Sequence, residues 1–433
     1  MTPPDPPGAH VTEKPGGVRT ITGASTSVPA FLGYTRVSPK DDPRAAVEPY
    51  TDAERRTPQL VRGWREFVVR YSMEGLTQER AEATTPKDRN ALERCFTLAE
   101  AVYGFFANGG RSCYVVGFTD PTQPVTAAAL AGSAEDRTGL GGLVTEPGVS
   151  MVAVPSLWEM TRAVPATEGP VVVSPADGKV LIEAVLKHCT EMRNRLALVD
   201  PPPGLLPGAV ETFANGQLAA PTTDDAAFTA LYYPWVAVPG IDGRRRTVPP
   251  CGHMAGVWAR TDAERGVFKA PANEAPRGVL EIPVLLTDEE QGALNAVGVN
   301  CLRAFPGRGL LVWGARTRST TRDWKYLSVR RLVCFLRDSI ELSSKWAVFE
   351  PNDERLWGAL RHAVSTFLMD QWRQGALVGR TPEEAFQVVC DESNNPREKR
   401  DEGEVHCDIG VAPVRPAEFV HFDVAQIAGR SGK

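Results

Sequence analysis

Several features of membrane, secreted or nucleic-acid-binding proteins are missing from this sequence. No apolar run approaches the roughly 18 residues of a membrane span, and the opening MTPPDPPGAH lacks the charged and apolar regions of a secretory signal. The formal net charge of −5 provides no general basic surface for nucleic acid. The eight cysteines form no C-x-x-C pair and mostly have apolar neighbours. This pattern favours reduced core thiols in a cytoplasmic protein.

Motifs for nucleotide hydrolysis, zinc binding and serine catalysis are missing as well. Asp200 ends an apolar strand as a magnesium-binding aspartate does, but no G-x-x-x-x-G-K-(S/T) is present to hold phosphates. Cys251 with His253, and His188 with Cys189, have no partner pair at zinc-like spacing. No G-x-S-x-G surrounds a serine. We therefore predict no enzyme activity, no catalytic or metal-binding residue and no cofactor.

The remaining pattern is that of a mixed α/β protein with two or three domains. A chain of 433 residues can bury a large core. A helix is predicted over 90–108 and a strand over 112–118. Strands at 149–154 and 195–199 flank a helical face that includes Leu181, and this βαβ unit implies parallel strands.

Composition predicts the character of the segments between these elements. Residues 74–90 are charged and are expected to form a surface loop, whereas 119–147, rich in Ala, Gly, Thr and Pro, are expected to form a linker or flexible insertion. Residues 226–238 predict one further strand. Residues 385–390 and 404–411 predict two strands joined by a polar hairpin or loop.

The most informative stretch of the chain runs from residue 298 to 353. GVNCLR and a β-type run at 309–313 lead into WGART, and VRR opens a helical run whose apolar residues recur at spacings of three and four. The stretch ends in WAVFEPND. Pro351 prevents the preceding helix from continuing, and Asn352 or Asp353 can cap the next one.

This ordered string of motifs resembles the C-terminal domain of contractile tail sheath proteins. These proteins build the sheaths of phage tails, R-type bacteriocins and phage-derived contractile injection systems. Further stretches resemble the same family, namely GASTSVPAFLGY, FFANGGRSCYVV, PPCGHMAGVWARTDAERGVFKAPAN and PAEF. The resemblance implies a multi-domain tail-sheath fold, with a βα core built from both chain ends, a projecting middle α/β domain of subtilisin-like fold, and extended terminal arms.

The resemblance also implies a division of the chain into five segments. They are an N-terminal arm (1–22), the N-terminal part of the core (23–142), the middle domain (143–283), the C-terminal core domain (284–412) and a C-terminal arm (413–433).

The function implied by the resemblance is structural. Such a subunit polymerises helically around an inner tube and contracts to drive the tube through a target envelope. Its partners would be other copies of itself, the inner tube protein, the baseplate and the terminator or cap proteins, with no nucleic acid and no membrane in the resting state. It would assemble in the bacterial cytoplasm as part of a phage tail or phage-like particle. Two alternatives stay open: a minor sheath paralogue that caps one end, and a hydrolase that uses the middle domain.

Two β-like segments at the chain ends are candidates for inter-subunit arms. Prolines isolate both segments, so their backbone groups need a sheet to pair with. Pairing of the two ends within one chain would satisfy them, and so would strand exchange between neighbours. The predicted arm residues are His10, Val11, Thr12, Val18, Thr20, Ile21, Glu418, Phe419, Val420, Phe422 and Val424. The predicted receiving strands contain Phe386, Val388, Val405, Cys407 and Ile409. Deleting 416–433 is then expected to leave a folded subunit that builds no sheath.

Two further groups of residues receive predictions. Charged residues are usually part of a solvated face, but in a helical assembly complementary charges can match between copies. The candidates are Arg244, Arg245, Arg330, Arg331, Asp338 and Glu341. Trp313 and Trp357 are expected to be buried in the C-terminal domain, where each would remove a large apolar area from water.

Overall fold

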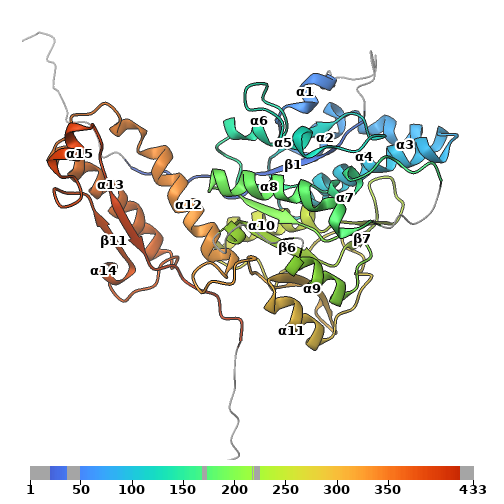
Figure 1. Ribbon diagram of the computed structural model, residues 1–433. Coiled ribbons are helices and arrows are strands. Elements are labelled where there is room, and N and C mark those ends of the chain that lie inside the picture. Colours follow the sequence, from blue (N-terminus) through green and yellow to red (C-terminus); the bar gives the residue numbers. More distant parts are fainter. Residues whose placement is uncertain (1–19, 37–48, 168–172, 217, 219–224, 420–433) are drawn as a thin grey trace, which may run out of the picture. The chain divides into compact units, whose positions relative to one another are not determined.

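The computed structural model describes residues 20–36, 49–167, 173–216, 218 and 225–419. The described chain forms two compact units. The larger contains residues 25–335 and 414–419, and the smaller contains residues 20–24 and 336–413. Figure 1 shows the helices and strands of both.

The larger unit is organised around an eight-stranded sheet of order β10-β9-β6-β5-β4-β1-β3-β2. The six inner strands run parallel, and the edge strands β2 and β10 run antiparallel to their neighbours. These strands are β1 Pro29–Tyr34, β2 Gln59–Val61, β3 Cys113–Phe118, β4 Met151–Ala153, β5 Leu196–Val199, β6 Thr229–Tyr233, β9 Val299–Phe305 and β10 Gly309–Trp313. The predicted βαβ unit is confirmed, because β4 and β5 pair in parallel and the helix α8 lies between them in the sequence.

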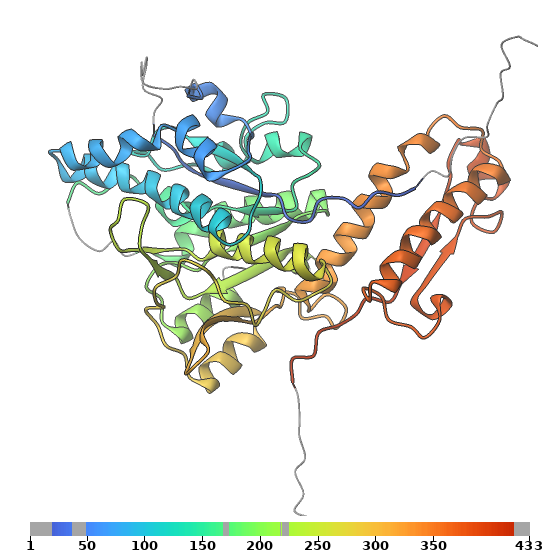
Figure 2. The same cartoon turned by 180° about the vertical axis from the view of Figure 1, so that it is seen from behind.

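Helices cover both faces of this sheet, which suits its apolar strands. Every residue of β1, β5 and β6 is buried, as expected of parallel strands with covered faces. Figures 1 and 2 show α8 on one face, with α4 and α10 on the other. The helices are α1 Asp52–Arg56, α2 Trp64–Arg70, α3 Met73–Glu82, α4 Pro86–Ala107, α5 Ala127–Ala131, α6 Gly139–Gly142, α7 Leu157–Met160, α8 Lys179–Met192, α9 Pro207–Gly216, α10 Cys251–Arg265 and α11 Asp288–Ala296.

Helices α4 and α10 approach each other closely at two glycines of the motif PPCGHMAG. A Cβ atom at Gly252 would lie 2.3 Å from the carbonyl oxygen of Ala101, and one at Gly256 would lie 2.5 Å from that of Phe105. Both distances are shorter than van der Waals contact allows, so a larger residue would push the two helices apart.

The smaller unit combines helices with a two-stranded antiparallel sheet. Helix α12, Leu327–Ser343, begins in the larger unit and ends in the smaller one. The remaining elements are a 3-10 helix at Lys345–Ala347, α13 Glu354–Arg373, α14 Pro382–Ala385, β11 Phe386–Val389, α15 Arg397–Asp401 and β12 Asp408–Val411. Asp353 caps α13 as predicted, its carboxylate accepting from the amides of Arg355 and Leu356. Leu356, Trp357, Leu360 and Cys390 form a small core.

Several predicted loops and strands are corrected by the structure. Residues 74–90 are mostly helical, since residues 74–82 belong to α3 and residues 86–90 begin α4. Thr85 caps α4, and Pro86 occupies its first turn. Residues 119–147 contain α5, α6 and a 3-10 helix, and Leu130, Leu140 and Leu143 anchor them in the core. The strand expected over 226–238 is split, because Pro234, which cannot donate a ladder hydrogen bond, separates β6 from β7. Strand β7 Val236–Val238 pairs instead with β8 Arg246–Val248.

The predicted domain boundaries also differ from the division in the structure. The boundaries at 142/143 and 283/284 fall within one continuous sheet, since β1 to β3, β4 to β6 and β9 to β10 come from three predicted segments. Of the two tryptophans, Trp357 is buried in the smaller unit as expected. Trp313 lies on edge strand β10 of the larger unit, where it is only half-buried.

Candidate functional site

Three motifs from distant parts of the sequence meet at one buried ion pair. The Arg331 guanidinium (from VRR) donates to the carboxylate of Asp262 (from ARTD), with a 2.9 Å contact from Nη1 to Oδ1. The hydroxyl of Thr26 (from GASTS) donates to the same carboxylate at 2.6 Å, and Arg331 also donates to the Thr26 carbonyl at 3.1 Å. Both charged side chains are largely shielded from solvent, with 3% of the Arg331 side chain and 5% of the Asp262 side chain exposed. These three residues thus join the start of the larger unit to α10 and α12.

A second contact joins the WGART and PAEF motifs. Arg316 donates to the carboxylate of Glu418 from Nε, at 2.7 Å, and from Nη2. A third donor atom of the same guanidinium contacts the Asn295 carbonyl at 2.8 Å. Asn300, from the GVN motif, holds the backbone of Arg316 at both its amide and its carbonyl. Residue 418, near the C-terminal end of the described chain, is therefore fixed to the larger unit.

The FFANGG motif, at the end of α4, also makes polar contacts with distant segments of the larger unit. The Asn108 side chain is fully buried, accepts from the Arg277 amide at 2.7 Å and donates to the carbonyls of Gly104 and Arg277. Arg260 donates to the Asn108 carbonyl at 3.2 Å. Gly109 has a φ of +110°, a conformation that favours glycine. The motifs that mark this sequence thus largely form polar contacts within one subunit. The contacts of Arg331 with Asp262, of Arg316 with Glu418 and of Asn108 with Arg277 are called the internal clamps below.

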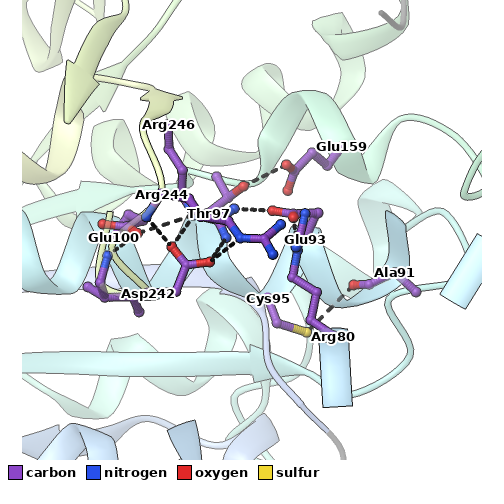
Figure 3. A network of polar contacts seen from close by, with 11 residues as sticks. Arg80, Ala91, Glu93, Cys95, Thr97, Glu100, Glu159, Asp242, Arg244 and Arg246 are labelled. Carbon is purple, nitrogen blue, oxygen red and sulfur yellow. Dashed lines mark hydrogen bonds and ion pairs between the residues drawn. The ribbon is translucent and has the colours of Figure 1, made fainter. Parts of the chain in front are cut away.

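Figure 3 shows a further network, in which three carboxylates surround Arg246. Glu93 and Glu100 come from α4, and Asp242 comes from the β7–β8 loop, where its carboxylate lies 2.6 Å from Arg246 Nη2. The Glu100 carboxylate also accepts from the amide of Ile241 at 2.7 Å. Burial raises the pKa of Glu100 to about 7, because desolvation disfavours the charged form. The network ties the β7–β8 hairpin to the helix layer.

The predicted interface charges fall into two groups. Arg331 is paired internally, and Arg330 is buried with its guanidinium 3.9 Å from the ring centroid of Phe228. These two residues are corrected from surface charges to internal ones, because the VRR motif lies on the buried face of α12. Arg244, Arg245 and Glu341 remain exposed, and Asp338 is half-buried. For these four an interface role stays a prediction.

The residues considered for catalysis or metal binding are all buried. Asp200 is buried, and its carboxylate accepts from the amide of Cys251 at 3.1 Å. Burial raises its pKa to about 7. Burial also lowers the pKa of His188 and of His253 to about 4, so both rings are neutral at pH 7. In the described part of the chain, no three His, Cys, Asp or Glu side chains gather closely enough to hold a metal ion.

The predicted receiving strands are partly formed. Phe386 and Val388 lie on β11 and Ile409 on β12, whereas Val405 and Cys407 precede β12. The sheet has two strands among the described residues, and such small sheets are marginal unless something packs on them or adds a strand. Helix α13 packs against β11, while Asp408, Ile409 and Gly410 are exposed.

Three exposed apolar side chains, which the sequence prediction missed, occur close together in the sequence between the end of α12 and the start of the FEPND motif. They are called the exposed apolar cluster below. The cluster consists of Leu342, Val348 and Phe349, and Phe349 is fully exposed. Phe349 also has a φ of +69°, a backbone conformation that bulky residues rarely adopt. The only signal in the sequence was the presence of Phe349 in a motif string that is unusually long.

The predicted arm residues are only partly described. His10, Val11, Thr12, Val18, Val420, Phe422 and Val424 lie outside the described residues. Thr20 and Ile21 precede a segment bound to α12, where the Thr22 amide donates to Ser343 Oγ at 3.1 Å and the Ala24 amide to Ser339 Oγ at 2.9 Å. Thr20, Ile21, Glu418 and Phe419 are not in strands, and Phe419 is exposed.

Comparison with known proteins places these features in a family. The model of the phage tail sheath protein central domain matches residues 171–318, and that of the phage tail sheath C-terminal domain matches residues 319–427. The tail sheath protein of Vibrio phage KVP40 is 30% identical over 181 residues, which make up 41% of this chain and 26% of that protein. A putative prophage major tail sheath protein of Pseudomonas aeruginosa strain UCBPP-PA14 is 27% identical, over 41% of this chain and 46% of that protein.

Solved structures match almost the whole chain. The PVC sheath complex of an extracellular contractile injection system, in its contracted state, has a TM-score of 0.70 and 27% identity over 98% of this chain and 99% of that one. The matched region spans less than half the length of the curated relatives. Across the described helices, none is both long and apolar enough to cross a membrane. From the two matching family models, the curated relatives and the solved sheath structures, this chain belongs to the contractile tail sheath protein family, a family of structural proteins.

Proposed function

We propose that this chain is the main subunit of a contractile sheath, which polymerises helically around an inner tube and contracts to drive the tube through a target envelope. The exposed cluster of Leu342, Val348 and Phe349 carries the proposal. In an isolated subunit, the exposed ring of Phe349 and its positive φ contribute nothing to stability. A neighbouring copy that covers the ring would recover both its hydrophobic contact and the cost of that conformation.

The internal clamps support a contraction that moves packed subunits as rigid bodies. Buried ion pairs with additional hydrogen bonds keep a domain in one arrangement while its outer contacts change. The ion pairs of Arg331 with Asp262 and of Arg316 with Glu418 both lie within the larger unit. Contraction would then draw its energy from new contacts between copies, with no nucleotide consumed and no catalytic residue involved.

The further partners and the setting belong to the same proposal. The subunit would contact the inner tube protein, the baseplate and a terminator, and would assemble in the bacterial cytoplasm. The terminal arms would add strands to the β11–β12 sheets of neighbouring copies. Arg244, Arg245, Asp338 and Glu341 would contribute contacts between copies.

Glu418 changes the design of the arm experiment. Deleting 416–433 would remove the carboxylate that pairs with buried Arg316, so the subunit would lose stability as well as any arm. A deletion that begins at residue 420 keeps this ion pair. We expect the shortened chain to unfold in urea as the parent does and to build no sheath when coexpressed with its neighbouring genes.

Electron microscopy of the coexpressed particles decides between the possibilities. Normal contractile particles from the chain lacking 420–433 would refute the arm assignment. Particles with normal sheaths in a strain lacking this gene would indicate a minor paralogue instead. Peptidase or ATPase turnover by the purified chain, abolished by a single substitution, would contradict the structural role.

A further inference from the structure

Two cysteines of the smaller unit stand opposite each other at the open end of the β11–β12 ladder. Cys390 faces Cys407 one step beyond the last paired residues. The Ala412 amide donates to the Ala385 carbonyl at 2.9 Å, and antiparallel rungs alternate between hydrogen-bonded and non-hydrogen-bonded pairs. Counting from that bond in the same register, the two cysteines occupy a non-hydrogen-bonded pair. Such pairs have Cα atoms about 4.5 Å apart, within the range of about 4.4–6.8 Å that a disulfide spans.

Two asparagines fix the base of the loop between these cysteines. The Asn394 side chain donates to the Val389 carbonyl at 2.8 Å and to the Asp408 carboxylate at 3.0 Å. The buried Asn395 side chain donates to the His406 carbonyl at 2.9 Å and accepts from the His406 amide at 2.6 Å. These hydrogen bonds connect the end of β11 to the start of β12, and therefore hold Cys390 and Cys407 near each other.

Cys407 packs against the small core that contains Cys390, and the two thiols are close enough to influence each other's pKa. Cys390 is fully buried beside Leu356 and Trp357, whereas Cys407 is half-buried and within reach of small molecules. Neither thiol belongs to any clamp described above. A pair held face to face, with one member accessible, has the arrangement of an attacking and a resolving thiol.

We propose that Cys390 and Cys407 form an intramolecular disulfide when the subunit meets a small-molecule disulfide as oxidant. The Cys407 thiolate attacks one sulfur of the oxidant, forming a mixed disulfide and releasing one small thiol. The Cys390 thiolate then attacks Cys407 Sγ, which forms the internal S–S bond and releases the second small thiol. Two protein thiols are oxidised and one small disulfide is reduced, so atoms and electrons balance.

The bond would lock the two strands together at the base of the 391–406 loop. It would therefore stiffen the sheet proposed to receive the arms, although the thiol chemistry itself does not depend on that role. Burial, together with the neighbouring Cys390, raises the pKa of the Cys407 thiol to about 12. Since only the thiolate reacts, oxidation should be slow near neutral pH and should accelerate about tenfold per pH unit below that pKa.

The experiment uses the full-length chain in buffers of reduced and oxidised glutathione, approached from two starting states. One sample starts fully reduced, and the other is oxidised during refolding. After equilibration, free thiols are alkylated, and proteolytic peptides are analysed by mass spectrometry. We expect a cross-linked peptide pair containing Cys390 and Cys407 from both samples, and a thermal midpoint above that of the reduced protein.

Three variants make the test specific. In Cys390→Ser, Cys407 should retain glutathione as a stable mixed disulfide, because no resolving thiol is present. Cys407→Ser should leave Cys390 reduced, since its thiol is buried. Cys95→Ala, which removes a buried cysteine from α4, should still form the cross-link. The proposal is overturned if both starting states converge on free thiols at Cys390 and Cys407, or if the bond forms between other cysteines.

Discussion

At the scale of single residues, the structure explains why so many motif positions are charged or polar. Asp262, Arg316, Arg331 and Asn108 are all half-buried or buried, and each has partners from a different part of the chain. Removing one member of such a pair leaves the other without compensation in a poorly solvated site, and that penalty exceeds what the intact pair contributes.

Arg331→Ala should cost about 3–5 kcal/mol of stability, because it leaves the buried Asp262 carboxylate unpaired. Urea titration of the parent and variant measures the difference. Arg337→Ala is the matched control, since its ion pair with Glu341 is largely exposed and should be worth less than about 0.5 kcal/mol. The double variant lacking both Arg331 and Asp262 should lose less than the sum of the two single losses. An Arg331→Ala loss no larger than that of the control would contradict the clamp.

Asp200 should make the subunit less stable as the pH rises. Burial raises its pKa from 3.8 to about 7, so between these values the folded state keeps a proton that the unfolded state has released. Stability then falls with rising pH across this window. Asp200→Asn keeps an acceptor for the Cys251 amide and should remove this part of the pH dependence, leaving the variant more stable than the parent above pH 7.

Urea titrations from about pH 4 to pH 8 test this expectation. The exposed Asp136→Asn serves as the control, and its profile should follow that of the parent. If the free energy of unfolding falls more steeply with rising pH in Asp200→Asn than in the parent, Asp200 is not protonated in the folded state.

At the scale of elements, the smaller unit contains a compact core at the start of α13. Trp357 provides its largest side chain, and its indole N–H donates to the Asn352 side chain at 2.9 Å. Asn352 in turn donates to the Glu404 carbonyl at 2.9 Å. The FEPND motif thus fixes the start of α13 to the loop that precedes β12.

Trp357→Ala should cost about 3–5 kcal/mol, because it removes the largest side chain from this core and leaves a cavity. Hydrogen exchange should become faster across α13, β11 and β12, while the eight-stranded sheet of the larger unit stays protected. Trp357→Phe keeps most of the apolar area but loses the hydrogen bond to Asn352, so its loss should be smaller. Equal exchange rates in the parent and in Trp357→Ala would place the tryptophan outside the core.

At the scale of the whole molecule, the structure separates stability within one subunit from contact between subunits. The clamps are internal, whereas the Leu342, Val348 and Phe349 cluster faces solvent. A substitution in the cluster should therefore affect assembly and leave folding intact, the reverse of the result expected at Arg331 or Trp357.

Phe349→Gly should stabilise the isolated subunit by about 1 kcal/mol and abolish assembly. Glycine adopts the positive φ of this position without strain, but it cannot bury an aromatic ring against a neighbour. Urea titration gives the first quantity, and sedimentation with electron microscopy of the coexpressed particles gives the second. Phe349→Tyr keeps the ring and should still assemble. Assembly of Phe349→Gly at the parental level would remove the cluster from the proposed interface.

The sequence alone determined the elements with strong periodicity and the family. Helix α12, strands β3 to β5, and the cap at Asp353 followed from spacing and local chemistry, which neighbouring residues decide. The tail sheath family followed from long ordered motifs. Loops such as 74–90 were mispredicted because helices there depend on a cap and on tertiary packing, which outweigh the weak preferences of charged residues.

Only the tertiary structure decided which motif residues work together. Thr26, Asp262 and Arg331 lie far apart in the sequence, and no local pattern shows that they share one ion pair. The same holds for Arg316 with Glu418, and for Cys390 facing Cys407 across the end of a sheet. Burial also determined which charged side chains are enclosed and which face solvent. Arg331 and Arg245 look alike as sequence, yet one is enclosed by the fold and the other remains in water. Sequence records which charges a chain has, but desolvation, which sets their energy, depends on what the folded chain places around them.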